Sequence, residues 1–261
     1  MPLIQRLAHY VPLSPDETAI LRDLQSGTSK VRRNRQIVRE GVKYESSFIL
    51  VEGFVIRSRM IPNGSRQVIN IGIPGDLLDF PGSFLESAMY SVTSLTDVVL
   101  SSISHVRLLS LWKSCPSLAA KIFWSFSSDA ALIIEHLVDV GRRSALERVA
   151  HFLLEFHARL RIIGWADDVS FPMLLTQEIL GDVLGLSVPH VNRTLRQLRE
   201  DGLITMEDQR VVIMDREGLA ALADFKGRAF TQFNLPDPFE SGEQGNQPNT
   251  PDGNAATTTA T

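Results

Sequence analysis

The sequence predicts an α+β fold, with an all-β region first, one long helix next and a smaller helical region last. Three observations support this order. Short strand-like runs punctuated by glycine fill roughly the first hundred residues. The stretch from Ser117 to Phe171 then contains no proline. Two short helical segments joined by a glycine follow at 176–200, and a pair of strand-like runs comes after them.

The composition indicates a globular protein. Of 261 residues, 44% are hydrophobic and 21% are charged. No run approaches about 18 consecutive apolar residues, and the first residues lack the order of a secretory signal, so we expect no membrane span and no export. The single cysteine, Cys115, excludes an internal disulfide, a multi-cysteine zinc site and an iron–sulfur cluster held by this chain's own thiolates. A reducing, cytoplasmic location is therefore expected.

The net charge of −4 comes from the C-terminal end of the chain. Residues 236–261 hold four of the 30 acids and none of the 26 bases, which leaves 26 acids and 26 bases in the rest. This segment also has four prolines, three glycines and one aromatic residue, too little apolar surface to offset the entropy of ordering it. We interpret 236–261 as a disordered acidic tail that keeps the protein soluble; an electrostatic autoinhibitory role is the alternative.

The strand-like runs of the first region are evenly spaced. Glycines at positions 41, 53, 64 and 75 recur at intervals of 12, 11 and 11 residues, with SFILVEG, FVIRSRMI and RQVINIGI between them. Strands at this spacing are typical of an all-β sandwich or barrel. Asn63-Gly64 suits a tight hairpin turn. Before the strands, Ser14 to Leu24 reads as a short helix with Ser14 as its N-cap.

The sequence shows no arrangement of residues that suits catalysis or metal binding. The six histidines are scattered, and His151 and His157 are six residues apart, so they do not share one helix face. Paired carboxylates and a phosphate-binding glycine loop are also missing. We therefore expect neither an enzyme nor a metal site.

The long helix predicts a dimer. Its apolar residues recur at intervals of three and four, which is nearly a heptad seam, and Phe123, Ile134 and Val138 form a second stripe. One helix cannot bury both stripes against one barrel, so we expect one face to pack on a twin helix; a core helix within a monomer is the alternative. The residues assigned to the dimer interface are Ile122, Phe126, Ile133 and Leu137. Gly141 is the candidate hinge after this helix, or else a simple break between two rigid parts.

Residues 176–204 predict a helix-turn-helix. Thr176 and Ser187 can cap the two helices, and Gly185 stands at the turn. In the second helix, about 188–200, Val191, Leu195 and Leu198 are expected to face inward. The opposite face is basic and carries no acid before position 200. Two strands around residues 207–209 complete a winged helix.

The second helix would enter the major groove of DNA. Arg193 is the candidate for a bidentate contact to guanine, and Asn192 could contact adenine or a phosphate. The candidate base-contacting residues are Arg193, Asn192, Pro189 and His190. The candidate phosphate-contacting residues, which position the protein without reading sequence, are Thr176, Ser187, Arg196 and Arg210.

The run LTQEILGDVLGLSVPHVNRTLRQLREDGLI, after a long helix and glycine-punctuated strands, resembles the Crp/Fnr family of bacterial transcription regulators. The resemblance implies a cyclic-nucleotide-binding-like, jelly-roll-like β-roll over 1–115, a dimerisation helix and hinge over 116–141, and a winged helix-turn-helix over 142–220. It also implies homodimers on palindromic promoter sites and contact with RNA polymerase. Arg193 matches the family's base-reading arginine. Pro189 stands where members often have glutamate, so the preferred DNA site should differ.

The same resemblance places a candidate effector pocket in the β-roll, at Asp79, Phe80, Tyr90 and Ser91. Members that bind cyclic AMP carry a Gly-Glu pair and an Arg-Ser pair at these positions. Here the arginine is missing and Asp79 would repel a phosphate, so cyclic-nucleotide binding is not expected. No cofactor is predicted; nothing in the sequence indicates haem, which stays open. Two functions remain: a homodimeric, sequence-specific DNA-binding regulator, which the basic helix face favours, and a ligand-binding sensor or scaffold with weak or no specific DNA binding.

Overall fold

The computed structural model of this chain describes residues 1–227, so the predicted acidic tail at 236–261 lies outside the described residues. The chain begins with helices α1 (Pro2–Tyr10) and α2 (Pro15–Leu24). The predicted cap of α2 is confirmed, because the Ser14 hydroxyl accepts a hydrogen bond from the Glu17 backbone at 3.1 Å. The Glu17 carboxylate accepts one in return from the Ser14 backbone at 2.8 Å.

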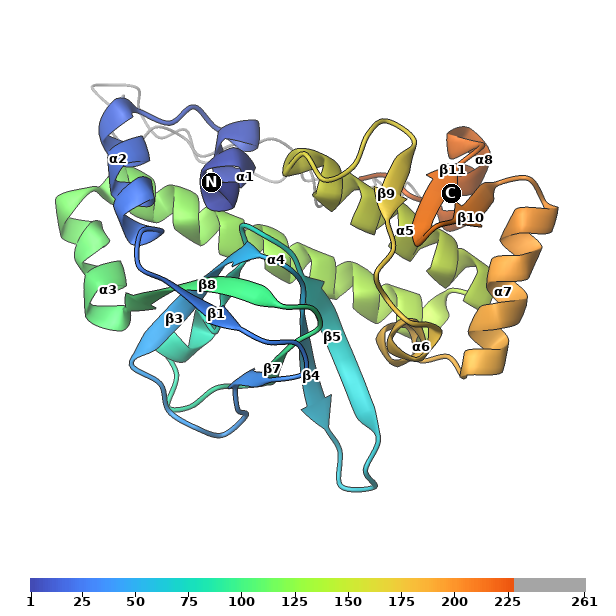
Figure 1. Cartoon of the computed structure of the whole chain (residues 1–261), viewed down its shortest axis with the longest axis horizontal. Coiled ribbons are helices and arrows are strands. Elements are labelled where there is room, and N and C mark those ends of the chain that lie inside the picture. Colours follow the sequence, from blue (N-terminus) through green and yellow to red (C-terminus); the bar gives the residue numbers. More distant parts are fainter. Residues whose placement is uncertain (228–261) are drawn as a thin grey trace, which may run out of the picture.

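The predicted all-β region is a roll of two four-stranded antiparallel sheets, with strand orders β1-β8-β3-β6 and β2-β7-β4-β5 (Figure 1). A 3-10 turn, Pro81–Ser83, lies between β6 and β7. The expected hairpin at Asn63-Gly64 joins β4 to β5, with Gly64 at φ +85°. The strands are β1 (Thr28–Val31), β2 (Gln36–Val38), β3 (Ser46–Glu52), β4 (Val55–Met60), β5 (Arg66–Gly72), β6 (Leu77–Leu78), β7 (Ser91–Ser94) and β8 (Val98–Ser104).

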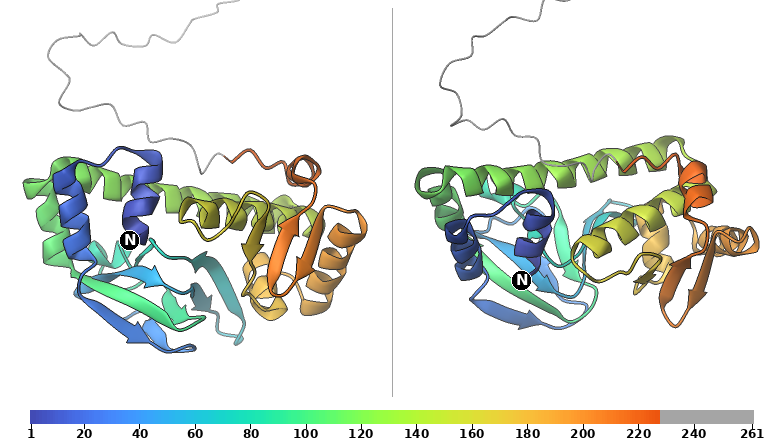
Figure 2. Two further views of the ribbon diagram at one scale, coloured as in Figure 1. Left: turned by 45° about the horizontal axis from the view of Figure 1, so that its top comes forward. Right: turned by 90° about the horizontal axis from the view of Figure 1, so that it is seen from above.

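Three helices follow the roll: α3 (His105–Ser114), α4 (Pro116–Arg142) and α5 (Ala145–Ile162). Figure 2 shows α4 along one long side of the molecule, with the roll and the C-terminal elements on its other side. The chain reverses direction between α4 and α5. A new capping box, in which Ser144 and Glu147 bond reciprocally, starts α5 there.

The C-terminal part is a winged helix-turn-helix. Its two-residue wing turn, Asp208-Gln209, has both φ angles positive, which is the backbone that such a hairpin needs. The order β10-β11-β9 makes a small antiparallel sheet beside the helices. The elements are β9 (Ser170–Pro172), α6 (Gln177–Leu184), α7 (Val188–Glu200), β10 (Ile204–Glu207), β11 (Arg210–Ile213) and α8 (Arg216–Ala223). The predicted α+β class is confirmed.

One hydrophobic core joins the roll to the C-terminal helices. Phe54 of the roll packs on Phe156 of α5, with ring centroids 6.1 Å apart, and both side chains are about 1% exposed. Arg66 of β5 donates to the Asp182 carboxylate of α6 at 2.8 Å through Nε. The roll therefore fixes the position of α6, the first helix of the helix-turn-helix.

Candidate nucleic-acid interface and sensor sites

The turn between α6 and α7 is held by close packing. Gly185 ends α6 in the left-handed conformation, at φ +65°. A Cβ on Gly181 would lie 2.5 Å from the Leu186 carbonyl oxygen, so only glycine fits at this crossing. Val191, Leu195 and Leu198 are buried, as the sequence predicted. The amphipathic pattern thus fixes which side of α7 faces outward.

The outward face of α7 offers polar side chains that are free to bind, among them Asn192 and Arg193. Asn192 and Arg193 are exposed, and neither side chain has a hydrogen bond or ion pair within residues 1–227. Arg196 donates to Glu200 at 2.7 Å, one helical turn later. Pro189 is exposed near the start of α7 and His190 is half-buried. The face is consistent with DNA contact through Arg193, while Glu200 partly neutralises Arg196.

The remaining phosphate candidates differ in how free they are. The Thr176 hydroxyl accepts from the Ile179 backbone at 3.3 Å, so it caps α6. Ser187 is exposed and forms no capping bond through its side chain, which leaves its hydroxyl free. Arg210 of the wing donates to Ser170 at 2.6 Å. Binding a phosphate through the same guanidinium nitrogen would require Arg210 to release that contact.

The exposed part of α4 differs from the predicted dimer seam. Ile122 is 3% exposed within the monomer, so the assignment of this residue to a dimer interface is wrong. Phe126 packs on Phe80 of the roll, with centroids 5.1 Å apart. Ile133 and Leu137 are exposed, Leu137 by 73%. The spacing of the apolar residues in the sequence could not show that the first half of α4 packs on the roll.

The predicted break at Gly141 is also displaced. The helix α4 continues through Gly141 and ends at Arg142. The next residue, Arg143, has an extended backbone with ψ at 147°. A Cβ on Gly141 would meet nothing within 4 Å. The change of direction therefore falls at Arg143 and Ser144, where the capping box of α5 supplies a new helix start and Gly141 is not needed for the turn.

By length and apolar composition, α4 alone among the described helices could cross a membrane. A core helix of a soluble protein meets the same criterion. The side of α4 that faces the protein carries Asp129, His136 and Asp139, all of them buried and close to charged or polar partners on neighbouring elements. These buried charged residues show that this side of α4 packs against the rest of the protein.

The candidate effector residues do not line any of the cavities described here. Phe80 is 4% exposed and packs between Phe84 and Phe126, which makes it part of the core. Ser91 accepts hydrogen bonds from the Glu40 backbone and the Gln36 side chain. Asp79 is 1% exposed, and burial raises the pKa of its carboxyl to about 6. Phe80 and Ser91 are thus engaged in contacts within the roll, and the role of the four candidate positions stays a prediction.

Arg57, which no sequence motif singled out, lies with its guanidinium inside the roll at 4% exposure. It donates to the Leu77 carbonyl at 3.0 Å and to Asn70 at 3.3 Å, and lies 3.8 Å from Asp76 and from Asp129. Burial opposes its charge, but Tyr90, Asp129 and Asp76 hold its pKa above the usual value. Its position among the apolar residues of β4 was the only signal in the sequence.

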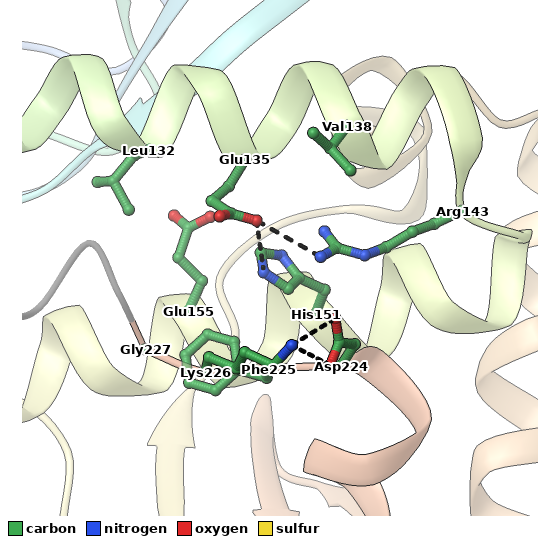
Figure 3. A pocket seen from close by; sticks show the side chains of 10 residues that line it. All are labelled: Leu132, Glu135, Val138, Arg143, His151, Glu155, Asp224, Phe225, Lys226 and Gly227. Carbon is green, nitrogen blue, oxygen red and sulfur yellow. Dashed lines mark hydrogen bonds and ion pairs between the residues drawn. The ribbon is translucent and has the colours of Figure 1, made fainter. Parts of the chain in front are cut away.

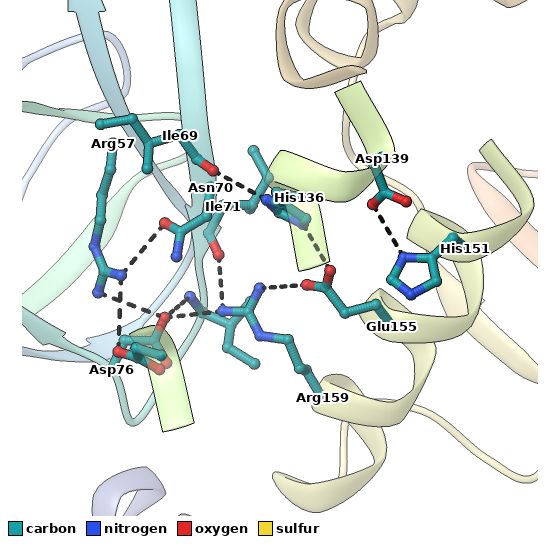
Figure 4. Close-up of polar contacts among 12 residues, drawn as sticks. Arg57, Ile69, Asn70, Ile71, Asp76, His136, Asp139, His151, Glu155 and Arg159 are labelled. Atoms are coloured by element: carbon teal, nitrogen blue, oxygen red, sulfur yellow. Dashed lines mark hydrogen bonds and ion pairs between the residues drawn. The ribbon is translucent and has the colours of Figure 1, made fainter. Parts of the chain in front are cut away.

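Arg57 belongs to a buried ionic network that links the roll, α4 and α5 (Figure 4). Arg159 of α5 donates to Asp76 of the roll at 3.0 Å and to the Ile71 carbonyl at 2.8 Å. His136 of α4 bonds Glu155 of α5 at 2.6 Å and the Ile69 carbonyl at 3.1 Å. The two domains are therefore held together by charges as well as by the shared core.

A cavity of about 220 Å³ lies where α4, α5 and the segment after α8 meet (Figure 3). His151 projects into it and lies 3.6 Å from Glu135 and 3.0 Å from Asp139. Phe225 forms another part of its wall, with its ring 5.3 Å from that of His151. Arg143 pairs with Glu135 and Lys226 with Asp224, while Glu155 pairs with His136 and Arg159 outside the wall, so these charged side chains already have partners.

Comparisons with known proteins agree with this architecture. Residues 28–115 match the cyclic nucleotide-binding domain, and 147–222 match the Crp-like helix-turn-helix domain. The transcriptional activatory protein AadR of Rhodopseudomonas palustris is 30% identical over 181 residues, 69% of this chain and 74% of AadR. The nitrogen fixation regulation protein FixK of Azorhizobium caulinodans is 28% identical over 73% of this chain and 76% of FixK. The solved structure of FixK2 from Bradyrhizobium japonicum superposes with a TM-score of 0.67 at 25% identity, over 75% of this chain and 96% of that one.

A roll joined by a long helix to a winged helix-turn-helix defines a class of DNA-binding transcription regulators. The similarity to AadR and the two domain matches place the chain more closely. It belongs to the Crp/Fnr family of transcription regulators, and it is not an enzyme.

Proposed function

We propose that this regulator acts as a homodimer whose two α7 helices enter successive major grooves of a palindromic promoter site. The observation that carries the proposal is the Arg193 side chain on the exposed face of α7, which has no partner among the described residues 1–227. A free guanidinium can form two parallel hydrogen bonds to guanine, whereas one already bound to an acid would first have to release it. Asn192, Pro189 and His190 lie beside it near the start of the helix, where base edges are expected.

The exposed apolar residues of α4 support the dimer. Phe123, Ile134, Leu137 and Val138 are 50%, 63%, 73% and 43% exposed, and they lie on one long helix. Monomeric proteins rarely leave a continuous apolar patch of this kind in water. A second copy of α4 would cover the patch and place two α7 helices symmetrically. Light scattering should therefore give about twice the 29.0 kDa of one chain.

The family resemblance supports two further parts of the proposal. The regulator contacts RNA polymerase at the promoter, and it acts in the cytoplasm, where that DNA lies. We propose no cofactor, and the buried Asp79 inside the roll argues against a cyclic phosphate there. The alternative function is a sensor with weak or no specific DNA binding. Measuring how binding depends on DNA sequence distinguishes it from the proposed function.

Replacing Arg193 with alanine tests which residues read sequence. Sites are first selected from random DNA, and binding is then measured on the selected site and its single-base variants. Arg193→Ala should lose about 1–3 kcal/mol of discrimination at one symmetric position. Arg196→Ala, the matched control, should weaken all sequences alike and lower the salt dependence by about one phosphate. Equal effects of both variants on every site would contradict the assigned roles, and binding that ignores sequence would support the alternative.

A further inference from the structure

His157 of α5 is fully buried and lies between two other segments of the winged helix-turn-helix. Its Nε2 atom lies 2.9 Å from the backbone carbonyl oxygen of Asp167, in the loop before β9. Its Nδ1 atom lies 3.1 Å from a guanidinium nitrogen of Arg216, the first residue of α8. One imidazole therefore connects α5 to the loop before β9 and to the start of α8.

These two neighbours determine where the ring carries its hydrogen. A carbonyl oxygen can only accept, so Nε2 is protonated and donates to the carbonyl of Asp167. A guanidinium can only donate, so Nδ1 has a free lone pair and accepts from Arg216. His157 is therefore a neutral imidazole in this contact. A second proton would have to enter at Nδ1, where it would face an N–H group of Arg216.

The surroundings of His157 oppose that second proton. Burial lowers the pKa of His157 below its ordinary value of 6.5, and the positive charges of Arg216 and Arg161 also lower it. The carbonyl and the carboxylate of Asp167 act in the opposite direction but do not cancel this effect. Hydrogen bonds, the largest from the Ser170 side chain, lower the pKa of the Asp167 carboxyl to about 2. Asp167 therefore stays ionised while His157 titrates.

The loop that His157 contacts supports the wing, which consists of β10, β11 and the turn between them. The Asp167 carboxylate accepts from the Ser170 backbone at 2.6 Å and from the Ser170 hydroxyl at 2.7 Å. The same hydroxyl accepts from Arg210 at 2.6 Å, and β9 pairs with β11 from Ser170 to Pro172. A shift of this loop therefore moves the strand that carries Arg210, the candidate phosphate contact of the wing.

The contact with Arg216 holds the wing from its other end. Arg216 comes three residues after Ile213, the last residue of β11, and begins α8. The backbone of Ile213 donates to the Val169 carbonyl at 2.8 Å, in the same loop before β9. The helix α8 packs on α5 and buries Leu219. His157 therefore contacts both the loop beside β11 and the helix that follows it.

We propose that neutral His157 is a positioning residue for the wing, and that its protonation releases the wing and weakens binding to DNA. This inference rests on the proposed function, because the wing acts only when the protein binds DNA. Protonation replaces the hydrogen bond to Arg216 with two positive charges 3.1 Å apart, so one of them must move away.

The direction of the pH effect follows from the contact. The pKa of folded His157 lies below 6.5, so the folded protein binds the second proton less tightly than the unfolded chain does. The stabilisation by neutral His157 is therefore complete above pH 6.5 and is lost as the pH falls through the lower pKa of the folded state.

This effect has the opposite sign to ordinary electrostatic attraction. Acidification makes a protein more positive, and His190 near the start of α7 would gain a charge close to the DNA. Both changes strengthen binding to phosphates. A loss of affinity at low pH therefore indicates a change in the position of the wing and not a change in overall charge.

The test measures specific binding at two pH values. Fluorescence anisotropy gives the affinity for the selected site at about pH 7.5 and about pH 5.5, which bracket the ordinary titration of histidine. The unmodified protein should bind about 10-fold more weakly at the lower pH. His157→Gln keeps a donor for the Asp167 carbonyl but does not titrate, so it should show no such loss. His9→Gln, which replaces an exposed histidine on α1, is the matched control and should behave like the unmodified protein.

Hydrogen exchange follows the wing without DNA. The Ile213 amide, which donates to Val169, should exchange faster at the lower pH after correction for its intrinsic rate. The same amide should stay protected in His157→Gln. Arg216→Gln removes the charge that faces Nδ1, so it should also reduce the loss of DNA affinity, and it provides the test if His157→Gln does not fold.

Three results would overturn the inference: unchanged or tighter binding at the lower pH, an equal loss in His157→Gln, or unchanged exchange of the Ile213 amide. A different result would refute the proposed function, namely that the unmodified protein does not distinguish the selected site from scrambled DNA at the higher pH. Hydrogen exchange would still decide in that case whether His157 holds the wing, so the two failures are distinguishable.

Discussion

The helices α7 and α4 use their amphipathic patterns in opposite ways. In α7 the apolar residues Val191, Leu195 and Leu198 are buried and the basic residues face outward. In the second half of α4 the charged residues face inward, while Ile134 and Leu137 are 63% and 73% exposed. The difference shows that a regular apolar stripe identifies a surface that must be covered, but does not say whether the same chain covers it.

The neighbours of each helix explain the contrast. The helix α7 packs on α5, α6 and β10 through its buried residues Val191, Leu195 and Leu198, so burial follows hydrophobicity. The inner face of α4 meets the roll and α5, where Arg57 and Arg159 are already buried. Buried guanidinium groups need carboxylate partners, and Asp129 and Glu155 supply them.

The largest expected effect comes from breaking the inward face of α4. Asp129 binds Arg6 directly and lies 3.8 Å from Arg57. Asp129→Ala leaves two buried positive charges short of a partner and should lower the free energy of unfolding by about 3–5 kcal/mol. Urea unfolding measures this loss. Asp168→Ala, which removes an exposed pair with Arg161, is the control and should cost under about 1 kcal/mol; similar losses for both would mean that the buried network adds no stability.

A substitution that introduces charge tests whether the outward face of α4 forms the dimer interface. Leu137→Glu should leave the fold intact, because the side chain is 73% exposed, but it puts two carboxylates into the proposed interface. The mass in solution should fall from twice 29.0 kDa to 29.0 kDa. Affinity for the palindromic site should fall about 100-fold as bivalent binding is lost. Met60→Glu, at a 60% exposed position on the β4–β5 hairpin, should change neither property; a Leu137→Glu protein that stays dimeric would exclude this face.

A smaller effect, dependent on pH, is expected at the contact of α4 with α5. Burial opposes a charged His136, but the Glu155 carboxylate outweighs burial and raises the pKa of His136 to about 9, from an ordinary value of 6.5. The folded state therefore holds the proton more tightly than the unfolded chain. This stabilisation is complete below pH 6.5 and disappears as the pH rises toward 9.

The stability should fall by up to about 1.4 kcal/mol for each pH unit in that window. Urea midpoints at several pH values measure the slope, and His136→Gln, which keeps a hydrogen-bonding side chain without the titration, is the control. An equally steep slope in His136→Gln would assign the pH dependence to other groups.

Much of the fold followed from local signals in the sequence. The Ser14 cap, the Gly64 hairpin and the helix-turn-helix around Gly185 depend on neighbouring residues, whose backbone preferences are the same in any context. The position of Arg193 on the exposed face of α7 followed from the period of one helix. The predicted break at Gly141 falls instead at Arg143 and Ser144, because a glycine is tolerated inside a helix and the chain turns at the Ser144 cap.

The sequence by itself determined the order of the domains, the family resemblance and the outward face of α7, since each depends on residues close together in the chain. Only the tertiary structure decided that Ile122 packs inside the monomer, that Arg57, Asp76 and Asp129 meet, and that the roll and α6 share a core. Those contacts join residues from distant parts of the chain, and their partners are fixed by packing and by the need to neutralise buried charge. No local pattern contains that information.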